Sequence, residues 1–158
     1  MRRSLRIGFG FGLTSGIIGT LGLMVGLESS TDSKLVVIGG ILAIAISEGF
    51  AEAISIHIAK EIEKIYNMKE IWESTLTTFI SKFIFSSIFI IPVLIFELHV
   101  AILESILFGL FLLFIISLLT AREKSIKPSI LIMKNIGIAV CVIIITHFIG
   151  IWISATFG

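Results

Sequence analysis

The chain has 158 residues, of which 56% are hydrophobic and only 15% are charged, and its mean hydropathy is +1.13. Soluble domains carry about 25% charged residues, so this composition excludes the soluble class and is typical of a membrane protein. The formal net charge of +1 gives no basis for nucleic-acid binding, and a single cysteine excludes an intrachain disulfide and a cysteine-based zinc cluster.

The first predicted span covers residues 7–27. Three arginines precede it: Arg2, Arg3 and Arg6. The apolar run is long enough for a helix that crosses a bilayer and too long for the core of a signal peptide. Gly8, Gly12 and Gly16 recur every four residues, so they share one helix face that another helix can approach closely. We expect this face to serve helix packing and to take part in a contact between two copies of the chain.

A short polar loop, 28–34, leads to the second predicted span, 35–58, which carries two carboxylates in an apolar run. Glu48 and Glu52 stand four residues apart, so they share one face of a helix and lie about 6 Å apart along its axis. A charged residue at the centre of a bilayer costs about 2.5–3.5 kcal/mol on insertion scales, and such residues usually mark an ion or proton path. This pair is therefore the candidate ion site.

A charged stretch, 60–73, follows the second span. Its apolar residues have roughly helical spacing, which predicts an amphipathic helix lying along the lipid headgroups. Four acids in it could gather cations or could form a solvated face: Glu61, Glu63, Glu70 and Glu73. Because lysines alternate with these acids, we expect the stretch to modulate transport and not to be required for it.

Three further spans are predicted, at 74–96, 101–120 and 136–157. In the third span, Lys82 lies about two turns from the start, where a lysine can extend its ammonium to the nearby interface. Pro92 should kink the far end of the same span. The chain is thus expected to be an all-α, multi-pass membrane protein, with residues 1–158 as one domain.

Charge placement predicts the orientation. With five spans and a basic loop at 121–135, ten of the 12 basic residues fall on one side of the membrane: Arg2, Arg3, Arg6, Lys60, Lys64, Lys69, Arg122, Lys124, Lys127 and Lys134. The positive-inside rule then places the N-terminus in the cytoplasm and the C-terminus outside. We expect the plasma membrane as the location. An odd number of spans favours a transport path between identical subunits.

Several polar residues near the carboxylates are secondary candidates. In this topology Thr14 and Ser15 lie at the depth of the carboxylate pair, and Ser47 is adjacent to it in sequence. His57 is expected at the cytoplasmic mouth and His147 near mid-depth in the last span. A lone histidine within a membrane more often makes a packing hydrogen bond than it ligates a metal. Packing and metal binding both remain open as roles for these histidines.

Five motifs together resemble the vacuolar iron transporter family. GIIGTLGLMVGL, residues 16–27, resembles the family's first helix, and LAIAISEGFAEAIS, residues 42–55, resembles its second. FIIPVL, residues 89–94, resembles the proline-bearing third helix. ILFGLFLLFIISLLTAREKS and the final helix ending in HFIG follow the order of the family's last two helices, so the resemblance covers nearly the whole chain.

The resemblance implies export or sequestration of Fe²⁺ and Mn²⁺ from the cytosol in exchange for protons, by a homodimer of five-helix subunits. The family's second-helix glutamate falls on Glu52, its methionine on Glu48, and its first-helix aspartate on Ser15. The stretch 60–73 stands where the family usually has a larger cytoplasmic metal-binding insert. The chain would be a minimal membrane domain that carries its metal as a substrate, with no permanent cofactor.

The two carboxylates predict divalent-cation binding without reference to the family resemblance. Carboxylate oxygens suit Mg²⁺, Mn²⁺ and Fe²⁺, whereas a thioether favours softer ions. The loss of the methionine therefore argues against selectivity for Fe²⁺ over Mn²⁺, and Glu48→Met is expected to restore it. Protons compete for the same oxygens. We expect Glu52 to matter more than Glu48, because it keeps the family's residue.

The sequence leaves two other functional classes open. One is a membrane packing or assembly protein that does not transport, with protonated Glu48 and Glu52 hydrogen-bonded across helices. The other is an intramembrane enzyme. The sequence has no paired aspartates, no nucleophile elbow and no HExxH motif, so we do not expect an enzyme.

Overall fold

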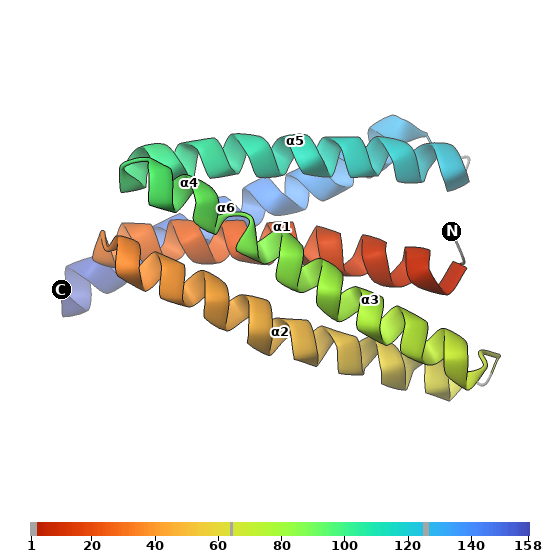
Figure 1. The fold of residues 1–158 in the computed structure, drawn as a ribbon. Coiled ribbons are helices and arrows are strands. Elements are labelled where there is room, and N and C mark those ends of the chain that lie inside the picture. Colours follow the sequence, from red (N-terminus) through yellow and green to blue (C-terminus); the bar gives the residue numbers. More distant parts are fainter. Residues whose placement is uncertain (1–2, 64, 125–126) are drawn as a thin grey trace.

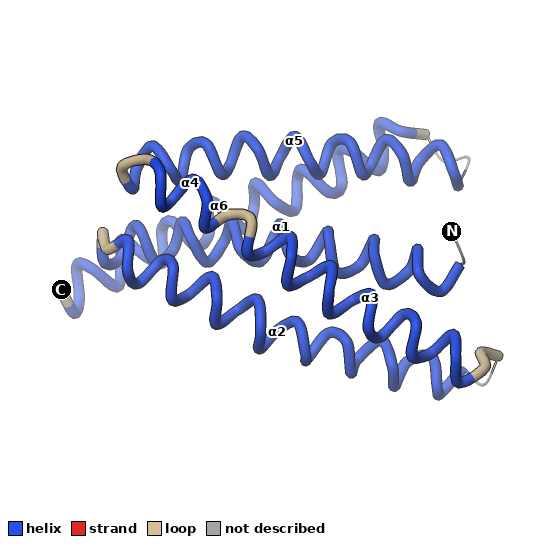
Figure 2. The backbone as a smooth tube through the Cα atoms, viewed as in Figure 1, coloured by secondary structure: helices blue, strands red, loops and turns tan. Residues whose placement is uncertain are grey.

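The computed structural model describes residues 3–63, 65–124 and 127–158, and this part of the chain is helical apart from short connections (Figures 1 and 2). The helices are α1 (Arg3–Thr31), α2 (Lys34–Glu63), α3 (Met68–Ser87), α4 (Ile90–Ile95), α5 (Leu98–Lys124) and α6 (Pro128–Phe157). The all-helical prediction is confirmed for the described residues. Five helical segments, with α3 and α4 counted as one, are long and apolar enough to cross a membrane.

Helix α1 is the centre of the bundle. It packs against α2 and α3 on one side and against α5 and α6 on the other (Figure 1). Its residues Ile17, Leu21 and Met24 are fully buried or nearly so, and they form the core together with side chains from the other helices. One end of the bundle holds the start of α1, the end of α2 and the start of α6; we call it the N-terminal end, and the opposite end the C-terminal end.

The helices are longer than the predicted spans, and two predicted loops are wrong. The polar loop expected at 28–34 is reduced to two residues, because α1 continues to Thr31. Asp32 then takes a left-handed conformation with φ of 46° and donates its N–H to the Glu28 carbonyl, which ends α1. The basic loop expected at 121–135 belongs largely to α5 and α6, since α6 begins at Pro128, a residue favoured in the first helical turn.

Pro92 interrupts the third span as predicted. Helix α3 ends at Ser87, a turn covers Ile88 and Phe89, and α4 starts at Ile90. Proline has no N–H, so the Ile88 carbonyl cannot receive the helical bond from position 92, and it accepts the N–H of Ile91 instead. The kink redirects the chain toward α5.

The prediction of an amphipathic helix at 60–73 is wrong. The first residues of this stretch extend α2 to Glu63, and the last residues begin α3 at Met68. Asn67 caps α3: its side chain accepts the Glu70 N–H, and the Glu70 carboxylate accepts the Asn67 N–H. This capping box is a strong start signal for a helix, and it divides the stretch into two arms of a helical hairpin.

The glycine face of α1 packs against α3 of the same chain. A Cβ atom at Gly8 would lie 2.5 Å from the Ser74 carbonyl oxygen, and one at Gly12 would meet the Thr78 carbonyl oxygen. Gly8, Gly12 and Gly16 are all buried in this contact. The face is therefore occupied within the chain, and the expectation that these glycines form a contact between two copies is wrong.

This packing predicts an unusual response to alanine. Alanine normally stabilises a helix by about 1 kcal/mol over glycine. At Gly12 it should instead lower the stability by about 1–3 kcal/mol, because the methyl group overlaps the α3 backbone. Thermal unfolding in detergent, followed by tryptophan fluorescence, measures the change. Gly137→Ala is the control, since nothing lies within 4 Å of a Cβ there; equal melting temperatures for both variants would contradict this packing.

Candidate functional site

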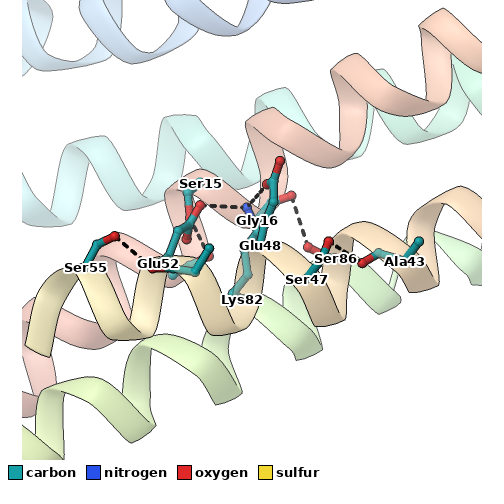
Figure 3. Close-up of polar contacts among 11 residues, drawn as sticks. Ser15, Gly16, Ala43, Ser47, Glu48, Glu52, Ser55, Lys82 and Ser86 are labelled. Carbon is teal, nitrogen blue, oxygen red and sulfur yellow. Dashed lines mark hydrogen bonds and ion pairs between the residues drawn. The ribbon is translucent and has the colours of Figure 1, made fainter.

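A buried lysine holds the two predicted carboxylates together. The Lys82 Nζ atom on α3 lies 2.7 Å from Glu48 Oε2 and 2.9 Å from Glu52 Oε1, both on α2 (Figure 3). The Lys82 side chain has no exposed surface, whereas those of Glu48 and Glu52 are 45% and 21% exposed. Two carboxylates and one ammonium give this triad a formal charge of −1.

The prediction that Lys82 reaches the nearby interface is wrong. Lys82 lies on a polar face of α3 that is turned inward. The other buried polar residues of this face are Ser74, Thr75, Thr78, Ser81 and Ser86. The Lys82 side chain packs beside glycines of both neighbouring helices: it lies 3.5 Å from a Cβ built at Gly16 of α1 and 3.8 Å from one at Gly49 of α2, which are ordinary contact distances. The ammonium is thus directed to α2, where the carboxylates replace the water that it lacks.

Ser15 joins the triad from α1. Its hydroxyl donates a hydrogen bond of 2.5 Å to Glu52 Oε2, the oxygen that does not contact the lysine most closely (Figure 3). The structure therefore brings together the three primary candidates, Ser15, Glu48 and Glu52. It adds Lys82, which the sequence did not predict in the site. One polar centre thus ties α1, α2 and α3 together.

An open cavity of about 970 Å³ leads to the triad from the N-terminal end of the bundle. Helix α1 lines it along its first half, from Arg3 to Gly19, and α5 and α6 contribute Thr120 and Asn135 near the mouth. Glu48, Glu52 and Lys82 also line it. The carboxylates are thus reachable from one end of the bundle although they lie at the middle of a predicted span.

Toward the C-terminal end the bundle is filled. Leu21 and Met24 of α1 and Val37 and Ile41 of α2 have 0–1% exposed surface. A cation at the triad would meet this apolar core on its way to the C-terminal end. The carboxylates are therefore accessible from the N-terminal end of the bundle and are separated from the C-terminal end by the apolar core.

The secondary candidates around the triad have different roles. Thr14 lines the cavity. Ser47 is exposed and donates to the Ala43 carbonyl on its own helix, so it does not face the carboxylate oxygens. His57 contacts the Thr75 hydroxyl at 3.1 Å and packs edge-on against Trp72. These contacts fit a role in helix packing.

His147 lies far from the triad, so its expected position at the depth of the carboxylates is wrong. Its Nδ1 atom is 2.7 Å from the Ser29 hydroxyl near the end of α1. Glu28 and His99 are in contact beside it, and a separate cavity of about 330 Å³ includes all three of these titratable side chains. This second polar cluster stands at the C-terminal end of the bundle.

The four acids of the stretch 60–73 do not form one cluster. Glu61 and Glu63 are exposed at the end of α2, while Glu70 caps α3. Glu73 accepts a hydrogen bond of 2.6 Å from the Ser4 hydroxyl and so ties the start of α1 to α3. At least two of the four therefore have structural partners.

Within the described residues, no three histidine, cysteine, aspartate or glutamate side chains are grouped so that they could hold a metal ion. One chain supplies two carboxylates and a hydroxyl at the triad, so a bound divalent cation would need further oxygens. No protein-family model, curated protein or solved structure matches the chain. The chemistry of the site consequently has to be argued from its own geometry.

Removing the lysine alone should destabilise the protein. Lys82→Met leaves two adjacent carboxylates without their cation; breaking a fully buried ion pair typically costs about 3–5 kcal/mol, and the loss here should be smaller because the Glu48 and Glu52 side chains are 45% and 21% exposed. The triple variant Glu48→Gln, Glu52→Gln, Lys82→Met removes all three charges and should recover most of the loss. Thermal unfolding in detergent compares the two with the wild type. A triple variant less stable than Lys82→Met would contradict the charge argument.

Proposed function

We propose that the protein transports divalent cations such as Mn²⁺ and Fe²⁺ across a membrane in exchange for protons, with Glu48 and Glu52 as the cation site. The single observation that carries this proposal is the open cavity that reaches two carboxylates in the middle of an apolar helix. Carboxylates at this depth are costly, and those that membrane proteins retain usually mark an ion or proton path. The filled core beyond them is what a transporter open to one side requires.

The lysine gives the site a built-in cation. The Lys82 ammonium occupies the place between Glu48 and Glu52 that a metal would take, so a metal binds only by displacing it. Glu48 is the more exposed carboxylate and would meet the incoming ion first, whereas Glu52 is held by both Ser15 and Lys82. Protons bind the same carboxylate oxygens, so metal and proton occupancy exclude each other.

A second copy of the chain would complete the coordination. Mg²⁺-like ions take about six oxygen ligands, and Ca²⁺ six to eight, more than one triad offers. A homodimer with a shared path would double the carboxylates, in line with the family resemblance. By the positive-inside rule we infer a cytoplasmic mouth for the cavity, since Arg3 and Arg6 line it, and the family resemblance implies transport out of the cytosol.

One observation favours a second function, that of a packing or assembly protein. The Lys82 ammonium is fully buried and bonded to both carboxylates, so the triad is already satisfied and joins three helices without a bound ion. In this alternative the lysine would offset the charge of one carboxylate, whereas the sequence alone suggested that both carboxylates are protonated. The two functions differ in whether cations cross the membrane.

Flux measurements on proteoliposomes separate the two functions. Glu52→Gln keeps the size of the side chain and removes its charge, so Mn²⁺ and Fe²⁺ flux should fall by at least about tenfold, the effect of losing roughly 1.4 kcal/mol of binding. Wild-type flux should also fall as the pH on the cavity side is lowered, because protons then occupy the carboxylates.

Glu97→Gln is the matched control, since its side chain is exposed in the connection between α4 and α5 and lies outside the cavity. It should transport at the wild-type rate. Flux that survives unchanged in Glu52→Gln and does not respond to pH would remove the carboxylates from the path and leave the packing function.

A further inference from the structure

Helix α1 presents bare backbone to the triad at Gly19. Ser15 and Gly19 stand four residues apart, so they share one face of α1, and the Ser15 hydroxyl donates to Glu52. A Cβ atom built at Gly19 would lie 3.3 Å from Glu48 Oε2 and 3.5 Å from Lys82 Nζ. Gly19 also lines the large cavity. The α1 backbone therefore borders the ion pair at a point that the cavity reaches.

Close packing of helices does not account for this glycine. At Gly8 a Cβ would come within 2.5 Å of a backbone oxygen of α3, which cannot move aside. At Gly19 the two nearest atoms are instead the ends of long side chains, and the next is a methyl carbon of Ile44 at 3.8 Å. The Glu48 side chain is 45% exposed and could yield by the few tenths of an ångström that an alanine needs. Since helices favour alanine over glycine, the missing methyl group calls for an explanation in the site itself.

The two carboxylates differ in what α1 offers them. Glu52 accepts hydrogen bonds from both Ser15 and Lys82, whereas the described residues give Glu48 only the Lys82 ammonium (Figure 3). A water molecule at the place of the Gly19 Cβ would be only slightly farther from Glu48 Oε2 than a hydrogen bond allows. A methyl group and a water molecule are of similar size, but only the water can ligate a cation.

We propose that Gly19 is a positioning residue of the cation site, because the space beside it lets a bound ion keep a water ligand between Glu48 and α1. Mg²⁺-like ions take about six oxygen ligands and usually keep several waters. Glu48, Glu52 and Ser15 supply side-chain oxygens, and a water beside Gly19 adds one that needs no side chain. This inference rests on the proposed cation transport and specifies its substrate, a divalent cation that enters the triad partly hydrated.

Gly19→Ala tests this role, because its methyl group takes the place of the water and cannot ligate the ion. Electron paramagnetic resonance follows Mn²⁺ binding to the purified protein in lipid discs. We expect the dissociation constant to rise about tenfold, the lower end of what changes beside metal ligands cost. Electron spin echo modulation in heavy water then counts the waters on bound Mn²⁺, and we expect about one fewer in the variant than in the wild type. A glycine that serves packing alone would not change this number.

Gly10→Ala is the matched control. Gly10 lies on the same helix and lines the same cavity, and nothing lies within 4 Å of a Cβ there. Its dissociation constant for Mn²⁺ should stay within about twofold of the wild-type value, with the same number of waters on the ion. Neither variant should melt below the wild type in thermal unfolding, because alanine favours the helix.

The possible failures point to different proposals. While the wild type binds Mn²⁺, four results would each overturn the role of Gly19 alone: an unchanged affinity in Gly19→Ala, an unchanged number of waters, a melting temperature below that of the wild type, or an equal loss in Gly10→Ala. If the wild type shows no saturable binding of Mn²⁺, the proposed cation site is wrong, and the role of Gly19 fails with it.

Discussion

A lysine ammonium with no access to solvent lies between two carboxylates, and the arrangement of the bundle depends on it. Burying a charge in a membrane protein is costly, and the cost falls only when partners replace the lost water. Lys82 obtains these partners from α2 while its own helix is pressed against α1. The position of α3 between α1 and α2 is therefore an electrostatic requirement as well as a packing result. Glycines at 8 and 12 make the close approach of α3 to α1 possible, because a Cβ at either position would overlap the α3 backbone.

The same constraint shapes the cavity. Because α2 and α3 are bound to one side of α1, helices α5 and α6 cover the other side, and the N-terminal half of α1 is left lining an open space. The triad stands at the inner end of that space and the two arginines at its mouth. Beyond the triad, apolar side chains such as Leu21 and Ile41 close the bundle.

Much of this could be predicted from the sequence, and the misses have physical causes. Apolar runs of membrane length predicted the five spans, and the four-residue spacing of Glu48 and Glu52 predicted a shared face, because both signals are local. Lys82 was misplaced because its partner depends on which face of α3 turns inward, and that is decided by contacts distant in sequence. A signal was nonetheless present: Ser74, Thr78 and Ser81 form a polar stripe at helical spacing, and such a stripe in an apolar helix needs a protein neighbour. The predicted loops are too long, because charged residues that belong to the ends of helices were assigned to the connections between them.

The central claim is that a divalent cation binds where the Lys82 ammonium now lies. Electron paramagnetic resonance of Mn²⁺ measures this directly, because the signal of the free ion falls as the ion binds to purified protein in lipid discs. The account predicts saturable binding at the triad that is lost in the Glu48→Gln, Glu52→Gln, Lys82→Met variant and is weakened as the pH is lowered. Binding of the same strength and stoichiometry in that triple variant, or no saturable binding by the wild type, would contradict it.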